Sequence, residues 1–256
     1  MRSKNVWVLP DLDEWRESFI EMIDEIHSFS DLCKRLRACD EPLSDENYVD
    51  KLNSILSEIN GYEFDFIGLM NSKFRSRYSF IWAAHLSKPI DINDVLTKGL
   101  LVFSSDDYME KVKSIFLNGD YPSVAEVNVS AAVKKVIAND SSRENKLYFF
   151  VTDFYKICHH YSEFGSEFML AVAADLKVKD KYKDNVRNQG ASTVFVCNVP
   201  VEKVSDKLIG CCLRIAMFYL FNPLLKKSDP LRIKDVAISI DSGLSPSNIV
   251  SHYAFP

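Results

Sequence analysis

Hydrophobic positions in residues 11–60 recur at intervals of three and four, the spacing of a helix with one apolar face. The first group contains Trp15, Phe19, Met22 and Ile26, and the spacing continues through Leu36. A second group, from residue 48 to residue 59, stops at an Asn-Gly pair, which is a common helix end. The pattern predicts an N-terminal helical region over residues 1–62, followed by a larger domain over residues 63–256.

From residue 64 the pattern changes to short aromatic and β-branched runs separated by helices. Strands are predicted at 78–84, 100–103, 125–129, 147–151, 193–199 and 236–240. Helices are predicted from Asp91 to Gly99, from Ser104, at 131–138, from Thr152, at 177–189 and near 208–221. Helices and strands that mix without regular βαβ spacing indicate an α+β fold.

Composition supports a globular protein, because 47% of the 256 residues are hydrophobic and can form a sizeable core. The longest apolar run, 208–225, contains Arg214 and Asn222-Pro223, which is typical of a buried helix and not of a membrane span. Six cysteines lack CxxC spacing, and the first residues lack the apolar run of a signal peptide, so reduced thiols and a cytoplasmic location are expected. A net charge of −5 argues against non-specific coating of nucleic acid.

Several motifs of common enzyme classes are absent from the sequence. It contains no GxxxxGK[ST], no GxGxxG after a strand, no HExxH and no GxSxG, which disfavours the corresponding nucleotide-binding, protease and hydrolase folds. The adjacent His159 and His160 point about 100° apart on a helix, so they do not fit a helical metal pair. No metal site is predicted.

Polar groups gather around the predicted strand at 147–151. Thr152 follows this strand at a predicted helix start, and Glu167 comes after Gly165-Ser166, where the chain can turn back. A strand-to-helix corner presents hydroxyls and backbone N–H groups to one point, which suits a phosphate-bearing ligand. The same residues also fit a simpler interpretation, in which the polar groups are helix caps and residues 168–173 pack in a core.

Five segments in a fixed order carry a family resemblance. They are YSFIWAAH, INDVLTKGLL, FFVTDFYKICHHY, VFVCNVP and VAISIDSGLSPSNIV, and the order of elements that they mark extends roughly from residue 64 to the end of the chain. This order resembles the ADP-ribosyltransferase fold, and in particular the bacterial toxins of anti-phage toxin–antitoxin systems, including those that modify mRNA. The resemblance implies a split β-sheet core with an N-terminal helical extension. It also implies NAD as substrate.

The resemblance also implies roles for individual residues. Thr152 stands where the family supports the nicotinamide ribose, and either Glu167 or Asp235 is the catalytic carboxylate. Trp82 and Ala83 occupy the positions of the family's NAD anchor, with His85 just beyond them. An aromatic wall for nicotinamide is expected from Trp82, Tyr148, Phe150 and Tyr161.

The expected acceptor is a single-stranded nucleic acid, with RNA favoured over DNA. Basic residues flank the proposed active-site segments, and those expected to dock the polymer are Arg75, Arg77, Lys181 and Lys183, with Tyr182 exposed for base stacking. An antitoxin-like protein partner is expected to cover the apolar N-terminal stripe if that stripe does not pack on its own domain. Two alternatives remain: a non-catalytic interaction domain, and a metal-dependent nuclease with Asp153, Glu163 and Glu167 as ligands.

Overall fold

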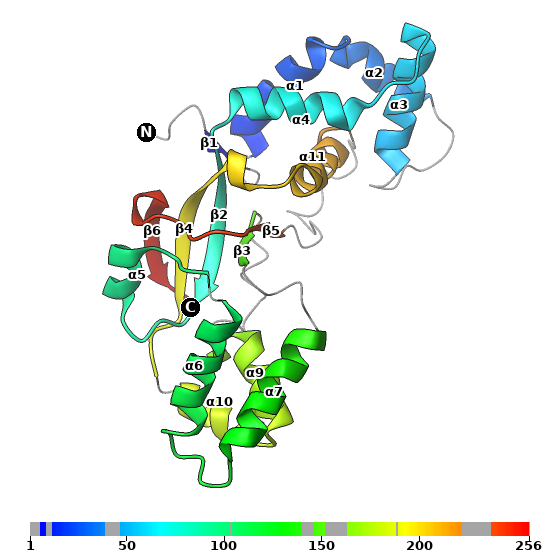
Figure 1. Ribbon diagram of the computed structural model, residues 1–256. Coiled ribbons are helices and arrows are strands. Elements are labelled where there is room, and N and C mark those ends of the chain that lie inside the picture. The colour runs from blue at the N-terminus through cyan, green and yellow to red at the C-terminus, as the bar shows by residue number, and fades with distance from the viewer. Residues whose placement is uncertain are drawn as a thin grey trace. The chain divides into compact units, whose positions relative to one another are not determined.

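The computed structural model describes residues 6–8, 12–38, 47–102, 104–139, 146–151, 163–187, 189–221 and 237–255. Helices and strands mix along these residues, which confirms the predicted α+β class (Figure 1). The helices and strands include β1 (Val6–Trp7), α1 (Leu12–Asp24), α2 (Phe29–Arg37), α3 (Asn47–Asn60), α4 (Phe66–Arg77), β2 (Phe80–Ser87), α5 (Ile92–Lys98), α6 (Ser105–Phe116), α7 (Glu126–Asn139), β3 (Leu147–Phe150), α9 (Glu167–Asp175), α10 (Lys179–Arg187), β4 (Thr193–Pro200), α11 (Asp206–Phe221), β5 (Ala237–Ile240) and β6 (Ile249–Ala254).

The described strands form a six-stranded sheet in the order β5-β3-β2-β4-β6, and β1 pairs with β2 in parallel. β4 runs antiparallel to β6, with Thr193 opposite Ala254. Seven of the eight side chains of β4 are buried, and Asn198 is half-buried, which explains the nearly continuous apolar run in its sequence. β6 lies at the end of this order, and its side chains are mostly exposed.

Contacts group the chain into two compact units, each made of several segments. Unit 1 contains Met1–Ala83, Phe150–Phe154 and Asn198–Ile238, and unit 2 contains Ala84–Phe149, Tyr155–Cys197 and Ser239–Pro256. The predicted division into folding domains after residue 62 stays a prediction.

Unit 1 is held together by aromatic side chains from segments far apart in the sequence. Trp7 of β1 is fully buried, and its ring centroid lies 6.3 Å from that of Phe19 on α1 and 5.1 Å from that of Phe74 on α4. Tyr48 of α3 contacts Phe218 of α11 edge to face, with ring centroids 5.4 Å apart. The apolar stripe of the N-terminal helices therefore packs within this unit, and buries Phe19 as its sequence period predicts.

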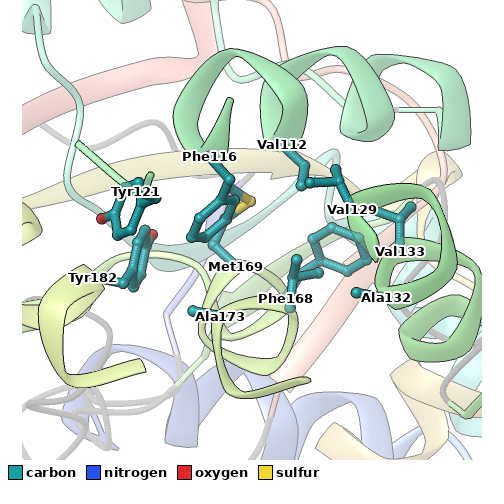
Figure 2. Packing of buried hydrophobic residues seen from close by; sticks show 11 residues of the cluster. Val112, Phe116, Tyr121, Val129, Ala132, Val133, Phe168, Met169, Ala173 and Tyr182 are labelled. Carbon is teal, nitrogen blue, oxygen red and sulfur yellow. The ribbon is translucent and has the colours of Figure 1, made fainter. Parts of the chain in front are cut away.

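Unit 2 contains a second hydrophobic cluster, built from α6, α7, α9 and α10 (Figure 2). Phe116 is fully buried, and its ring centroid lies 5.0 Å from that of Tyr121 and 5.6 Å from that of Tyr182. α9 contributes Phe168 and Met169 to this core, followed by Val172 and Ala173 one turn later. The predicted core over residues 168–173 is confirmed, with Leu170 packed at its margin.

The observed ends of α5 and α6 agree with the helix ends that the sequence predicts. The side chain of Asp91 accepts a hydrogen bond from the N–H of Asn93 (2.8 Å) at the start of α5, and Gly99 ends this helix with φ +84°. Ser104 and Asp107 form a reciprocal capping box at the start of α6. These bonds lower the pKa of the Asp107 carboxyl, because they favour its charged form.

Two predicted strands are wrong. Residues 125–129 belong mainly to α7, because Val129, Ala132 and Val133 continue at the helical spacing of three and four and are buried together. Leu100 forms only an isolated bridge with Leu244, so no strand covers the described part of 100–103. α4 and β6 were not predicted. The predicted helix start at Thr152 lies outside the described residues, and α9 begins at Glu167.

α11 is the buried helix that its apolar sequence predicts, with Ile209, Leu213 and Met217 on its packed side. Within the described part of the chain, no helix has both the length and the apolar character needed to cross a membrane. The cysteines found there are free thiols. Burial raises the pKa of the Cys197 thiol to about 12, so it stays protonated and packs as a small apolar side chain.

Candidate functional site

His85 is the polar side chain that β2 places against β3. Its Nδ1 lies 2.9 Å from the carbonyl oxygen of Tyr148, and its ring centroid lies 5.6 Å from that of Phe149. A carbonyl oxygen only accepts hydrogen bonds, so Nδ1 carries the proton and donates. Burial lowers the pKa of His85, which favours the neutral ring near neutral pH. The other nitrogen, Nε2, is then an acceptor, and no described residue donates a hydrogen bond to it.

Aromatic side chains of β3 alternate between the two faces of the strand. Leu147 and Phe149 are buried, whereas Tyr148 is 39% exposed and Phe150 is half-buried. Because successive side chains on a strand point to opposite faces, Tyr148 and Phe150 share the more open face. Trp82, on β2, is half-buried. These three aromatics lie on the sheet, and their role as a nicotinamide wall stays a prediction.

Lys88 anchors the chain just after β2. Its Nζ donates to the carbonyl oxygens of Glu163 and Arg187, both at 3.1 Å. Nε of Arg187 donates in turn to the carboxylate of Glu163 at 2.9 Å. Burial lowers the pKa of Lys88. Because the carbonyl of Arg187 is at the end of α10, the Lys88 ammonium caps this helix and complements its negative pole.

Glu167 is the first residue of α9, directly after Ser166, and its side chain is half-buried. A carboxylate in the first helical turn is favoured by the helix dipole. The segment before it is fixed, because Lys88 holds the carbonyl of Glu163 four residues earlier. Glu167, His85 and Tyr148 all belong to unit 2. The other candidate carboxylate, Asp235, and the candidates Thr152 and Tyr161 lie outside the described residues.

Sequence reasoning overlooked Lys88 as a site residue. Its signal is a lysine followed by proline directly after a strand, a position where the chain leaves the sheet and the ammonium can reach other segments. Gly190 marks the same junction, because a Cβ there would lie 2.5 Å from the carbonyl oxygen of Pro89. The end of β2 is thus packed tightly against the segment that leads into β4.

Arg75 is engaged by protein groups. Its Nη1 donates to the carbonyl of Val201 (2.9 Å), its Nη2 to that of Val204 (2.7 Å), and its Nε to the carboxylate of Asp206 (2.8 Å). This network joins α4 to the start of α11. Arg77 pairs with Glu21 on α1. Both guanidinium groups therefore have structural contacts within unit 1.

The two lysines predicted to dock nucleic acid lie on α10 in unit 2. Nζ of Lys181 lies 2.9 Å from a carboxylate oxygen of Asp120 and 5.6 Å from the ring centroid of Tyr121. Nζ of Lys183 lies 4.7 Å from the ring centroid of Phe164, and no acidic partner for it occurs among the described residues. Lys183 is thus the cation with the fewest competing contacts.

The prediction that Tyr182 is exposed for base stacking is wrong. Its side chain is 4% exposed and packs against Phe116 in the core of unit 2 (Figure 2). Burial and the neighbouring Tyr121 raise its pKa to about 12. The charged residues around it suggested a solvated segment, but a nine-residue helix needs one apolar anchor to pack, and Tyr182 supplies it.

Acidic groups do not form a metal site within the described ranges, where no three His, Cys, Asp or Glu side chains converge. Glu163 is paired with Arg187 at 2.9 Å, and Asp153 lies outside those ranges.

No family model, curated protein or solved structure matches this chain.

Proposed function

We propose that this protein is an enzyme that transfers ADP-ribose from NAD to a macromolecule, with RNA as the favoured acceptor. The ordered resemblance from residue 64 onward supports this proposal, and the α+β fold is compatible with it. The observation that carries it is the environment of His85, which lies just past the positions of the family's NAD anchor. A neutral imidazole fixed through Nδ1 offers Nε2 to a hydroxyl donor, and NAD carries ribose hydroxyls.

The chemistry needs few groups from the protein. The bond between C1′ of the ribose and the nicotinamide nitrogen breaks, and nicotinamide leaves with the bonding electrons. The ribose passes through an oxocarbenium-like state, which a nearby carboxylate stabilises. An acceptor hydroxyl or amine then attacks C1′ and gives up its proton to a base. Glu167 and Asp235 are the two candidates for that carboxylate.

The biological role that goes with this activity is that of a toxin or defence effector. Modification of mRNA in the cytoplasm would block translation and phage growth, and an antitoxin-like partner would restrain the enzyme. These parts of the proposal come from the resemblance alone. The alternative with a specific observation behind it is a non-catalytic binding domain, because Trp82 and Ala83 stand where the family has its NAD anchor.

Transfer of label from NAD to protein, DNA and RNA, offered in parallel, tests the proposal. Label in RNA supports it, and a folded protein that labels nothing selects the non-catalytic alternative. Metal-dependent cleavage of nucleic acid without NAD would select the nuclease. Glu167→Gln and Asp235→Asn then identify the catalytic carboxylate, because one of the two should abolish transfer. Full activity in both variants would exclude both residues.

A matched pair of substitutions tests His85. The amide of His85→Asn reaches the position of Nδ1 and keeps the bond to the Tyr148 carbonyl, but it places no acceptor at the position of Nε2. His85→Gln extends a polar group to the Nε2 position. Transfer should fall about tenfold to a hundredfold in the Asn variant and less in the Gln variant. Wild-type transfer by His85→Asn would contradict the assignment.

A further inference from the structure

β6 is an edge strand with an open hydrogen-bonding side. It ends the strand order of the sheet, so within the described residues only β4 pairs with it (Figure 1). Of its residues, Ile249 is half-buried and the following five are exposed. An open edge presents unpaired N–H and C=O groups, and proteins usually guard such an edge with charged residues, proline or a bulge.

The register identifies which backbone groups face outward. The N–H of Phe255 donates to the carbonyl of Ser192 at 2.9 Å. In an antiparallel pair, hydrogen-bonded positions alternate with non-bonded ones, so Tyr253 and Ser251 also direct their backbone groups to β4. His252 and Ala254 therefore direct their N–H and C=O groups away from β4, toward the open side.

β6 has only one of these protective features, a bulge near its start. The register shifts between Val196 and Cys197, and this leaves Val250 as an extra residue on β6. The irregularity protects the start of β6, but the pairing from Ser251 to Ala254 is regular. No residue from 249 to 254 is charged or a proline, although the chain as a whole carries a net charge of −5.

We propose that β6 pairs with β6 of a second copy of this chain, in antiparallel orientation about a two-fold axis at Tyr253. In this register His252 lies opposite Ala254 of the second copy, so the outward groups of both residues form four backbone hydrogen bonds. Tyr253, which is 41% exposed, lies opposite its own counterpart at a non-hydrogen-bonded position, where side chains approach most closely. Aromatic pairs at such positions are stabilising.

Charge and symmetry favour a second copy of this chain as the partner that pairs with the open edge of β6. Every cross-strand pair in this register is uncharged, so the pairing brings no like charges together despite the net negative charge of each copy. An edge that pairs with itself satisfies both open sides at once, as in other isologous interfaces. The proposal concerns assembly, and it does not depend on the enzymatic activity proposed above.

Sedimentation of the full chain over a wide range of concentration tests the assembly. Wild-type protein should pass from monomer to dimer as the concentration rises. Ala254→Pro should remain monomeric, because the lost N–H faces the open side and β4 does not use it. A wild-type chain that is monomeric at every concentration, or Ala254→Pro protein that dimerises like the wild type, would overturn the proposal. The first result would also be expected if the edge binds a peptide of another protein.

Cysteine cross-linking tests the register. Under mild oxidation Tyr253→Cys should form a covalent dimer, because opposite positions of a non-hydrogen-bonded pair bring the two Cβ atoms within about 4.5–5.5 Å. Ser251→Cys is the matched control. Its two copies would lie about 13 Å apart, four residues out of register, and should cross-link no more than wild-type protein. Equal cross-linking of the two variants would contradict the proposed pairing.

Discussion

At the scale of single residues, His85 links stability to pH. Burial lowers its pKa in the folded protein below the ordinary value of 6.5, so in acid the unfolded chain binds a proton more readily than the folded chain. The free energy of unfolding should therefore fall as the pH decreases from about 8 to about 5.5. The slope contributed by this one group cannot exceed about 1.4 kcal/mol per pH unit.

Chemical denaturation of wild-type protein and of His85→Asn, at several pH values in that range, measures the effect. The Asn variant has no imidazole to protonate at this position, so its unfolding free energy should depend less steeply on pH. Parallel pH profiles for the two proteins would show that His85 is not the group responsible. The same variant serves the transfer assay, so its fold and its activity are checked together.

A second prediction at this scale separates a core tyrosine from a surface tyrosine. Tyr182 is 4% exposed, whereas Tyr148 is 39% exposed. Tyr182→Ala should lower the free energy of unfolding by about 3 kcal/mol or more, because it leaves a cavity in the core of unit 2. Tyr148→Ala should cost much less. Similar losses of stability in the two variants, measured by denaturant unfolding, would argue against the packing in Figure 2.

At the scale of elements, close packing explains why one glycine is required and another is not. Gly99 and Gly61 both have a positive φ, +84° and +73°, and Gly99 combines it with a ψ of −171°. A Cβ on Gly99 would lie 2.1 Å from the carbonyl oxygen of Leu244, whereas a Cβ on Gly61 would meet nothing within 4 Å. Gly61→Ala incurs the backbone cost of a positive φ, about 1–2 kcal/mol. Gly99→Ala adds both the clash and a backbone conformation that is essentially restricted to glycine.

Thermal unfolding should therefore give a clearly lower Tm for Gly99→Ala than for Gly61→Ala. A larger loss in Gly61→Ala would mean that the segment around Leu244 does not pack against the end of α5. The two glycines share their position, since each follows the last residue of a helix.

The elements also show how far the sequence predicts this fold. The helix starts at Asp91 and Ser104 were predicted correctly, because the hydrogen bonds of their caps lie within a few residues. α4 was missed although Phe66, Met70 and Phe74 recur every four residues and are buried, because its basic residues were interpreted as a nucleic-acid docking patch. β6 was missed because an exposed edge strand has no alternation of buried and exposed positions to reveal it.

At the scale of the whole molecule, long-range contacts account for most of what the sequence did not predict. Arg75 was expected to face nucleic acid, yet it binds Val201, Val204 and Asp206, more than a hundred residues later in the chain. A local sequence pattern does not reveal hydrogen-bond partners that lie so far apart in the chain. The basic residues at 75, 77, 181 and 183 therefore do not form one equivalent set, and a variant that changes all four would mix loss of stability with loss of docking.

The prediction that basic residues dock RNA can therefore be tested most clearly at the two lysines of α10. Lys183 contacts the ring of Phe164, and Lys181 pairs with an exposed carboxylate, Asp120, so both ammonium groups can turn to phosphates at small cost. Lys181→Gln/Lys183→Gln should weaken binding of single-stranded RNA. For each lysine that contacts a phosphate, the slope of log affinity against log salt should also decrease by about 0.7.

Two controls make this result interpretable. Lys34→Gln removes an equally ordinary surface lysine on α2, with 72% of its side chain exposed, and should change neither affinity nor slope. Arg75→Gln should instead lower the Tm, since it breaks the network between α4 and α11. If the double lysine variant binds RNA with wild-type affinity and salt dependence while remaining folded, α10 does not dock the acceptor. Slow NAD hydrolysis should persist in that variant, because only contact with the polymer has been removed.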